Sequence, residues 1–335
     1  MSFFDVHVKR TISSTRAQFV MLMMGMVVTG VFASVNHASA MAVSPVKFDF
    51  EIAPGQAVQE RIRLLNDTNQ KETFTLFAEN FIAQGEDGGQ AYVGRDHSTG
   101  LASWIRPSAP SVTLNPGEAK EFPFLISIPQ NAEPGGHYAT IFFARAGNQS
   151  GGSGVGVAEE IGVLLLVRVP GNIREEASIE SFRVIPDATS DRLPVHFELR
   201  IRNTGSVHLR PKGTIAVKNM LGYTVARVAT NSQDSAVLPN SVRRLISSWV
   251  KAEDLEEGFL YELVNEWRNF AIGRYTATAE LTYGSRNIAL SHDRIVFWVW
   301  PWRLMIVFVL LLMTIVFGIK GYNRMIVRMA VKNRK

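Results

Sequence analysis

Between residues 42 and 294 the chain is a succession of short segments in which apolar and polar positions alternate. In residues 195–202, for instance, Val, Phe, Leu and Ile occupy every second position, with His, Glu and Arg between them. Because successive side chains of a strand point to opposite faces, this alternation predicts half-buried β-strands. Strands are predicted at residues 43–52, 58–65, 73–81, 102–105, 111–114, 120–128, 138–144, 163–169, 179–184, 195–201, 212–218, 223–228, 241–249, 275–283 and 295–298.

Turn residues separate these strands, as in Pro54-Gly55, Asn66-Asp67 and Asn115-Pro116-Gly117. Many short strands with turn signals about every 8–12 residues are typical of β-sandwiches. The alternating region is long enough for two domains of ordinary size. We therefore predict an all-β protein with two tandem immunoglobulin-like β-sandwich domains, at residues 41–170 and 171–294.

Two segments depart from the alternation. Residues 83–100 are rich in glycine and predict a long surface loop. Residues 255–270 instead repeat apolar side chains at every third or fourth position, which predicts a short helical insertion in the second domain. The apolar positions of that repeat are Leu255, Phe259, Leu263, Trp267 and Phe270.

The C-terminal part predicts a membrane span. Trp298, Trp300 and Trp302 alternate around a proline, Arg303 follows, and residues 304–319 carry no charge. A bilayer core needs about 20 mostly apolar residues, tryptophan prefers the headgroup level, and an arginine can reach back to that level along its apolar stem. We predict a transmembrane helix with a tryptophan belt at residues 295–319. A core helix of a soluble protein would need neither the belt nor the basic tail.

The tail at residues 320–335 contains six basic residues and no acidic one. By the positive-inside rule it lies in the cytoplasm and the sandwich domains lie outside. Four of its basic residues would form one stripe if the helix continued, either to contact anionic lipid or only to set the topology. These residues are Lys320, Arg324, Arg328 and Lys332.

Residues 1–40 have the features of a secretory signal peptide. Basic residues precede an apolar stretch at residues 19–32, and Ala38-Ser39-Ala40 provides a cleavage site. An uncleaved N-terminal anchor is the alternative. Either way we expect a single-pass protein of the cell membrane, with most of the chain extracytoplasmic and its C-terminus cytoplasmic.

Composition excludes several classes of function. The chain has no cysteine, which rules out a disulfide scaffold, a thiolate nucleophile and cysteine-ligated metals. The net charge is +5, but the signal peptide and the tail hold much of that excess. The charges of the predicted outer domains are mixed, so we predict no nucleic-acid surface.

No catalytic constellation is visible in the sequence. The histidines after the signal peptide are scattered, and no pair has the i,i+4 spacing of a metal site. Residues 85–89 contain Glu86 and Asp87 between glycines, but two carboxylates fall short of the six to eight oxygen ligands of calcium, so a solvated turn is preferred. We predict a non-enzymatic protein without a cofactor or a metal.

The candidate partner-binding site is the segment at residues 83–105, which contains Tyr92, Arg95, His97 and Trp104. Loops on rigid sandwiches commonly carry binding, and Tyr, Trp and Arg are enriched in binding hot spots. Trp104 has a second interpretation as a core residue packed between the sheets.

Several turn motifs are shared with a known family. They are Val43-Ser44-Pro45, Pro54-Gly55 and Asn66-Asp67, the segment at 129–143, the segment at 155–169, and Asn203-Thr204-Gly205-x-x-His208-x-x-Pro211-x-Gly213. In order and spacing they resemble bacterial WxL-interacting proteins, which combine a peptidoglycan-binding domain, a membrane-proximal domain, one span and a basic tail. The helical insertion departs from the family pattern.

The resemblance implies an envelope protein whose first domain binds the cell wall, as peptidoglycan, or a surface protein. A sandwich suits this role because a partner strand can extend its sheet edges. The alternative is a membrane-tethered, chaperone-like assembly factor for exported proteins that uses the same edges transiently. An envelope enzyme, with a site assembled from scattered residues, is the third hypothesis.

Overall fold

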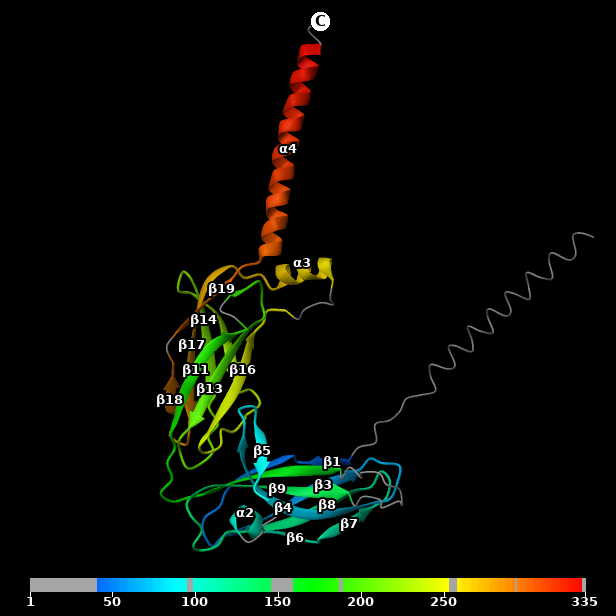
Figure 1. The fold of residues 1–335 in the computed structure, drawn as a ribbon, viewed down its shortest axis with the longest axis vertical. Helices are drawn as coiled ribbons and strands as arrows, with labels where there is room; N and C mark the ends of the chain where they lie inside the picture. Colours follow the sequence, from blue (N-terminus) through cyan, green and yellow to red (C-terminus); the bar gives the residue numbers. More distant parts are fainter. Residues whose placement is uncertain are drawn as a thin grey trace, which may run out of the picture.

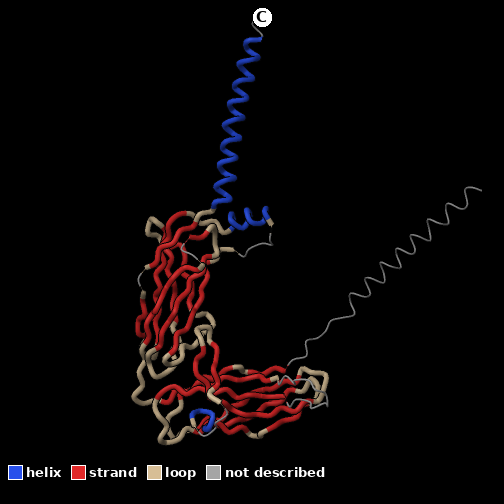
Figure 2. Tube along the Cα trace, in the orientation of Figure 1, coloured by secondary structure: helices blue, strands red, loops and turns tan. Residues whose placement is uncertain are grey.

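The computed structural model describes residues 41–94, 99–145, 159–186, 189–252, 258–292 and 294–332. Two β-sandwich domains meet at an angle, and one long helix, α4 (Trp302–Lys332), projects from the far end of the second domain (Figure 1). Figure 2 shows that strands make up most of both domains. The predicted two-sandwich, all-β architecture with one C-terminal apolar helix is confirmed. The predicted signal peptide lies outside the described residues.

The first domain packs two sheets face to face. One has the order β1 (Met41–Ser44), β3 (Ala57–Asn66), β8 (Ala119–Ser127), β6 (Ile105–Pro107). The other has the order β2 (Lys47–Glu51), β10 (Glu160–Val169), β9 (Gly135–Arg145), β4 (Glu72–Gln84), β5 (Gly89–Tyr92), with β7 (Ser111–Leu114) beside β4. β2 and β10 run parallel, and their neighbours pair antiparallel.

The alternation of the sequence places the first core. On β4, Phe74 and Leu76 are buried between the sheets, whereas Thr73 and Thr75 are exposed. Burying one such apolar side chain contributes about 1.5–3 kcal/mol relative to leaving it in water. The same parity on β9 and β10 adds Ile141, Phe143, Val163, Leu165 and Val167 to this core.

The second domain is built in the same way. A sheet of β11 (Ala177–Ile185), β13 (Val195–Asn203) and β16 (Ser241–Trp249) packs on a second sheet. That sheet has the order β12 (Thr189–Ser190), β19 (Ile295–Val299), β17 (Gly273–Tyr283), β14 (Lys212–Asn219), β15 (Thr224–Thr230), with β18 (Ile288–Ser291) beside β17. Phe297 lies at the centre of its core, 5.6 Å from Phe197 and 5.7 Å from Tyr275 between ring centres.

Two predicted strands have a different structure. Residues 43–52 form β1 and β2, which belong to different sheets, because Pro45 between them has no N–H to continue a ladder. Residues 102–105 lie mainly in a single helical turn, α2 (Gly100–Trp104), that buries Leu101 and Ala102. Such a short apolar run fits either periodicity, so the pattern could not separate strand from helix.

The predicted long loop at residues 83–100 is largely a hairpin. β4 extends to Gln84, which pairs with Gly89 at the start of β5. Gly85 and Gly88 take φ values of 63° and 89° in the turn, a conformation that glycine adopts without steric cost. The glycines of this segment therefore make a tight connection instead of a long loop.

Two helices of the described residues, α3 (Phe259–Arg268) and α4, lie at the far end of the second domain (Figure 1). α3 confirms the helical insertion, and Leu255 lies outside the described residues. β19 bears out the strand predicted at residues 295–298 and pairs with β17. The membrane helix predicted from residue 295 therefore begins only at Trp302, as α4. Within α4, Trp302–Ile326 is long and apolar enough to cross a bilayer, and no part of its most apolar stretch is buried against the protein.

Candidate binding site at the domain junction

The β4–β5 hairpin reaches from the first domain to the second. At its turn, Arg200 of β13 donates two hydrogen bonds to Glu86, one of them from Nε at 2.7 Å. Arg244 of β16 donates two to Asp87, at 2.7 and 2.8 Å. The backbone N–H of Arg244 also donates to the Glu86 carbonyl at 2.8 Å. Such forked pairs fix direction as well as distance, so the turn holds the second domain in place.

The turn was expected to be solvated and not to hold calcium, and its carboxylates pair with arginines of the second domain. Gly88 permits the close approach, because a Cβ at this position would lie 1.6 Å from Nη1 of Arg243. Within the described ranges, no cluster of His, Asp and Glu could hold a metal ion.

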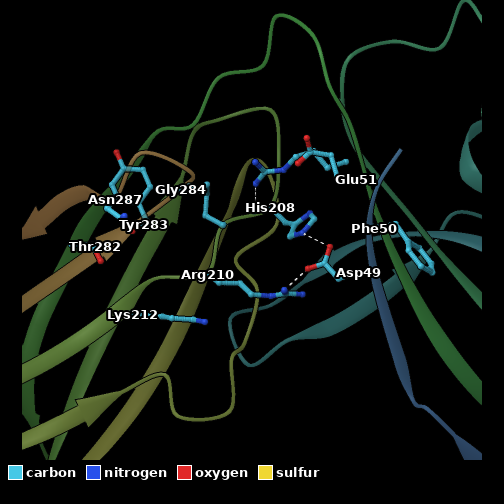
Figure 3. A pocket seen from close by; sticks show the side chains of 12 residues that line it. Asp49, Phe50, Glu51, His208, Arg210, Lys212, Thr282, Tyr283, Gly284 and Asn287 are labelled. Carbon is cyan, nitrogen blue, oxygen red and sulfur yellow. Dashed lines mark hydrogen bonds and ion pairs between the residues drawn. The ribbon is translucent and has the colours of Figure 1, made fainter. Parts of the chain in front are cut away.

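A row of polar side chains forms the second contact between the domains. Nε2 of His208 lies 3.1 Å from Oδ1 of Asp49 on β2, and the Tyr138 hydroxyl lies 3.3 Å from its Nδ1. If Nε2 donates to the carboxylate, Nδ1 is free to accept from Tyr138. Arg210 pairs with the other oxygen of Asp49. Figure 3 shows the Asp49 carboxylate between His208 and Arg210.

The neighbouring groups set the protonation states of Asp49 and Tyr138. Burial raises the pKa of Asp49, but the hydrogen bond from His208 and the positive charge of Arg210 outweigh it, so the pKa of the carboxyl is lowered. Burial also raises the pKa of the Tyr138 hydroxyl far above its usual value. Tyr138 therefore keeps its proton and acts as a hydrogen-bond donor.

The segment that connects the domains makes the third contact between them. Arg168, near the end of β10, donates to Glu175 at 2.8 Å and to the His208 carbonyl at 3.3 Å. Glu175 also accepts from the backbone N–H and the hydroxyl of Ser285, at 2.9 and 3.0 Å. Burial raises the pKa of Glu175, but the bonds from Ser285 and Arg168 lower it overall. The connecting segment is therefore held by both domains.

The second and third of these contacts border an open cleft of about 440 Å³. Its walls come from residues 49–51 and Arg168 of the first domain and from residues 208–212 and 282–287 of the second (Figure 3). The Lys212 side chain is 68% exposed and pairs with Asp234 at 3.1 Å. Nη2 of Arg210 is buried in the wall, without a hydrogen-bond partner among the described residues. Cationic donors suit an anionic oxygen group and not a metal ion.

Two of the four predicted loop residues, Tyr92 and Trp104, lie in the described part of the chain. Tyr92 packs in an aromatic cluster, with ring centres 5.0 Å from Phe142 and 6.3 Å from Phe81. Trp104 is partly buried and packs against the first core, with its ring centre 4.6 Å from that of His137. Arg95 and His97 lie outside the described residues.

The predicted membrane-interface residues fall into two groups. Trp298 and Trp300 precede α4 and stack on each other at 5.8 Å, and Trp302 is the first residue of α4. Arg303 does not point freely to an interface: its Nη1 lies 2.8 Å from Asp191 and 2.9 Å from Glu266. The helix continues through the basic tail positions Lys320, Arg324, Arg328 and Lys332, as a single stripe requires.

Sequence analysis missed the junction because its partners are distant along the chain. Glu86 and Arg200 are separated by 114 residues, and Asp49 and His208 by 159. Two signals were present without being decisive. Two carboxylates occupied a glycine-flanked turn, and His208 stood inside the motif that opens the second domain.

No family model matches the chain, and no curated protein matches it in sequence. Among solved structures it is similar to the class 5 fimbriae chaperone CfaA, at 11% identity and a TM-score of 0.37, over 78% of this chain and 100% of that one. It is also similar to the CsuC–CsuE chaperone–tip adhesion subunit complex of Acinetobacter baumannii (12%, TM-score 0.33, 78% and 98%). A third is the E. coli chaperone DraB (8%, TM-score 0.33, 77% and 97%). Likenesses at these TM-scores support no conclusion about the function of this chain.

Proposed function

We propose that this protein is a non-enzymatic, membrane-tethered assembly factor that binds an extended segment of another exported polypeptide at its domain junction. The observation that carries the proposal is the cleft itself. Its borders are held by ion pairs between the domains, yet it stays open and presents the exposed Lys212, with Arg210 in its wall. This is the assembly-factor alternative left open by the sequence.

An extended ligand fits because the cleft lies beside a sheet edge. β2 is the terminal strand of its sheet, so one side of its backbone is unpaired among the described strands. A strand added there would gain main-chain hydrogen bonds. Its terminal or side-chain carboxylate would then meet Lys212, whose present ion pair with Asp234 is half-exposed and worth only about 0–1 kcal/mol.

The polar chain beside the cleft favours a structural role over catalysis. Tyr138, His208 and Asp49 are linked in the order that an acid–base relay would use. However, His208 is only 4% exposed, and burial keeps the Tyr138 hydroxyl protonated. A group that holds its proton and has little access to solvent is a poor nucleophile or base.

The anchoring part of the proposal rests on α4, whose apolar segment is unburied and of spanning length. The orientation, with both domains outside and the tail in the cytoplasm, stays a prediction, as do the resemblance to WxL-interacting proteins and peptidoglycan as a ligand. The surface-protein partner expected from that resemblance is compatible with the same cleft.

The test uses the full chain in lipid nanodiscs and synthetic peptides that match the C-termini of exported proteins, as free acids and as amides. Lys212→Gln should weaken free-acid binding about tenfold, or about 1.4 kcal/mol, and leave amide binding unchanged. Lys218→Gln is the matched control, since Lys218 is exposed on the same strand, β14.

Equal binding of acids and amides, or equal effects of the two lysine variants, would contradict a carboxylate site in the cleft. Retention of the chain on purified cell walls, with no peptide binding, would favour the wall-binding hypothesis instead.

A further inference from the structure

The helix α3 has a reversed polarity. Two of its polar side chains, Asn265 and Glu266, are 2% and 0% exposed, and Arg268 at its end is exposed. The apolar side chains Tyr261, Val264 and Trp267 are 47%, 44% and 73% exposed. Residues three apart lie on one side of a helix, so these three form an apolar stripe directed away from the protein. A helix on a water-soluble domain has the opposite arrangement.

Other exposed apolar residues gather at the same end of the second domain. Met220, at the turn between β14 and β15, lies against the start of β17, since a Cβ on Gly273 would be 2.4 Å from its Cε. Gly273 follows the α3 segment closely, so the turn and this segment are neighbours. The exposed residues here are Phe270 and Ile272 after α3, and Met220, Leu221 and Tyr223 in the turn.

The apolar membrane helix starts at this end. Gly273 pairs with Val299, three residues before α4. Oε2 of Glu266 accepts the Leu304 N–H at 2.9 Å, and Oε1 accepts from Arg303 at 2.9 Å. Figure 1 shows α3 beside the base of α4, at the end of the domain from which α4 projects. Glu266 therefore fixes α3 beside the point where α4 leaves the domain.

We propose that these residues form a membrane-contact face that inserts into the outer surface of the bilayer and sets the orientation of both domains on it. The inference rests on α4 spanning the membrane, as in the proposed function. The face consists of Tyr261, Val264, Trp267, Phe270 and Ile272, together with Met220, Leu221 and Tyr223. An amphipathic helix lying in the interfacial plane and aromatic rings at headgroup level are both features of such a contact.

A bilayer is favoured over a protein partner because the face continues into a helix that is itself exposed and apolar. The attraction comes from apolar insertion, not from charge, because residues 253–257, just before α3, include four acidic residues. A neutral phospholipid surface is therefore sufficient. The tether provided by α4 keeps that surface at high effective concentration, so a modest contact is populated.

The absence of cysteine permits site-specific labels in the full chain. Val264→Cys and Leu221→Cys test the face, and Ile82→Cys, an exposed apolar position of the first domain, is the matched control. Val309→Cys reports on α4. Each variant carries an environment-sensitive fluorophore in phosphatidylcholine vesicles and is quenched by shallow lipid-borne nitroxide or by aqueous iodide.

For labels at 264 and 221 we expect nitroxide quenching roughly threefold stronger, and iodide quenching roughly threefold weaker, than at 82, as for groups a few ångströms inside the interface. Adding Trp267→Ser to the 264 label should move both values toward those at 82.

Quenching at 264 and 221 equal to that at 82, with the 309 label reached by nitroxide, would overturn the contact face and leave the anchor intact. Protection from iodide without nitroxide quenching would also overturn it, because a second copy or a protein partner would then cover the face. Failure at 309 as well would refute the membrane anchor of the proposed function.

Discussion

Replacing Glu266 should release α3 from the base of α4. The carboxylate is fully buried and accepts two hydrogen bonds, from the backbone N–H of Leu304 and from Arg303. Glu266→Ala leaves Leu304 without an acceptor and removes one of the carboxylates that surround Arg303. Breaking a buried ion pair costs about 3–5 kcal/mol. Glu266→Gln keeps the volume but loses the charge, for about 1.5–3 kcal/mol.

The loss of stability will be confined to α3 and the start of α4. α3 has ten residues, and from residue 261 onward none of its apolar side chains is buried. It therefore opens before the second domain unfolds. Because about 1.4 kcal/mol corresponds to a factor of ten, Glu266→Ala should speed amide exchange in α3 and at Leu304 by about 100-fold or more. Hydrogen–deuterium exchange of the full chain in nanodiscs measures this.

Glu262→Gln is the control, one turn earlier on the same helix. Its carboxylate is 31% exposed and lies 3.5 Å from Arg192 and 3.6 Å from Arg303, a geometry worth about 0–1 kcal/mol. Equal loss of protection in Glu262→Gln and Glu266→Gln, or unchanged exchange in Glu266→Ala, would refute the idea that the buried carboxylate holds α3.

Three further outcomes follow from the junction and the second core. Glu86→Gln with Asp87→Asn should broaden the distance distribution between spin labels on the two domains, while near-ultraviolet circular dichroism stays unchanged. The lowered pKa of Asp49 gives stability that is full above the unfolded value of about 3.9 and is lost as pH falls through the folded value. The Tm should therefore fall less steeply between pH 7 and pH 3 in Asp49→Asn than in the unmodified protein. Gly213→Ala would place a Cβ 2.1 Å from the Glu280 carbonyl, and overpacking of about 1–3 kcal/mol should lower the Tm of the second domain.

The sequence by itself determined the strands and the apolar helix, because these depend on residues that are neighbours along the chain. Alternation identified β16 at residues 241–249 with its observed bounds, because the period of a strand decides which side chains share a face. An uncharged run followed by basic residues likewise identified α4. Where local signals were ambiguous, as at residues 102–105, only packing on the first core selected a helical turn.

Tertiary structure alone decided the junction and the direction of α3. A glutamate in a glycine-rich turn has the same local sequence whether it is solvated or, like Glu86, paired with an arginine 114 residues away. The periodicity of α3 likewise defines two faces without saying which is buried. Glu266 is inside because Arg303 and the Leu304 N–H satisfy its charge there. A buried carboxylate is tolerated only when such partners exist, and they are supplied by a helix that begins 34 residues after α3 ends.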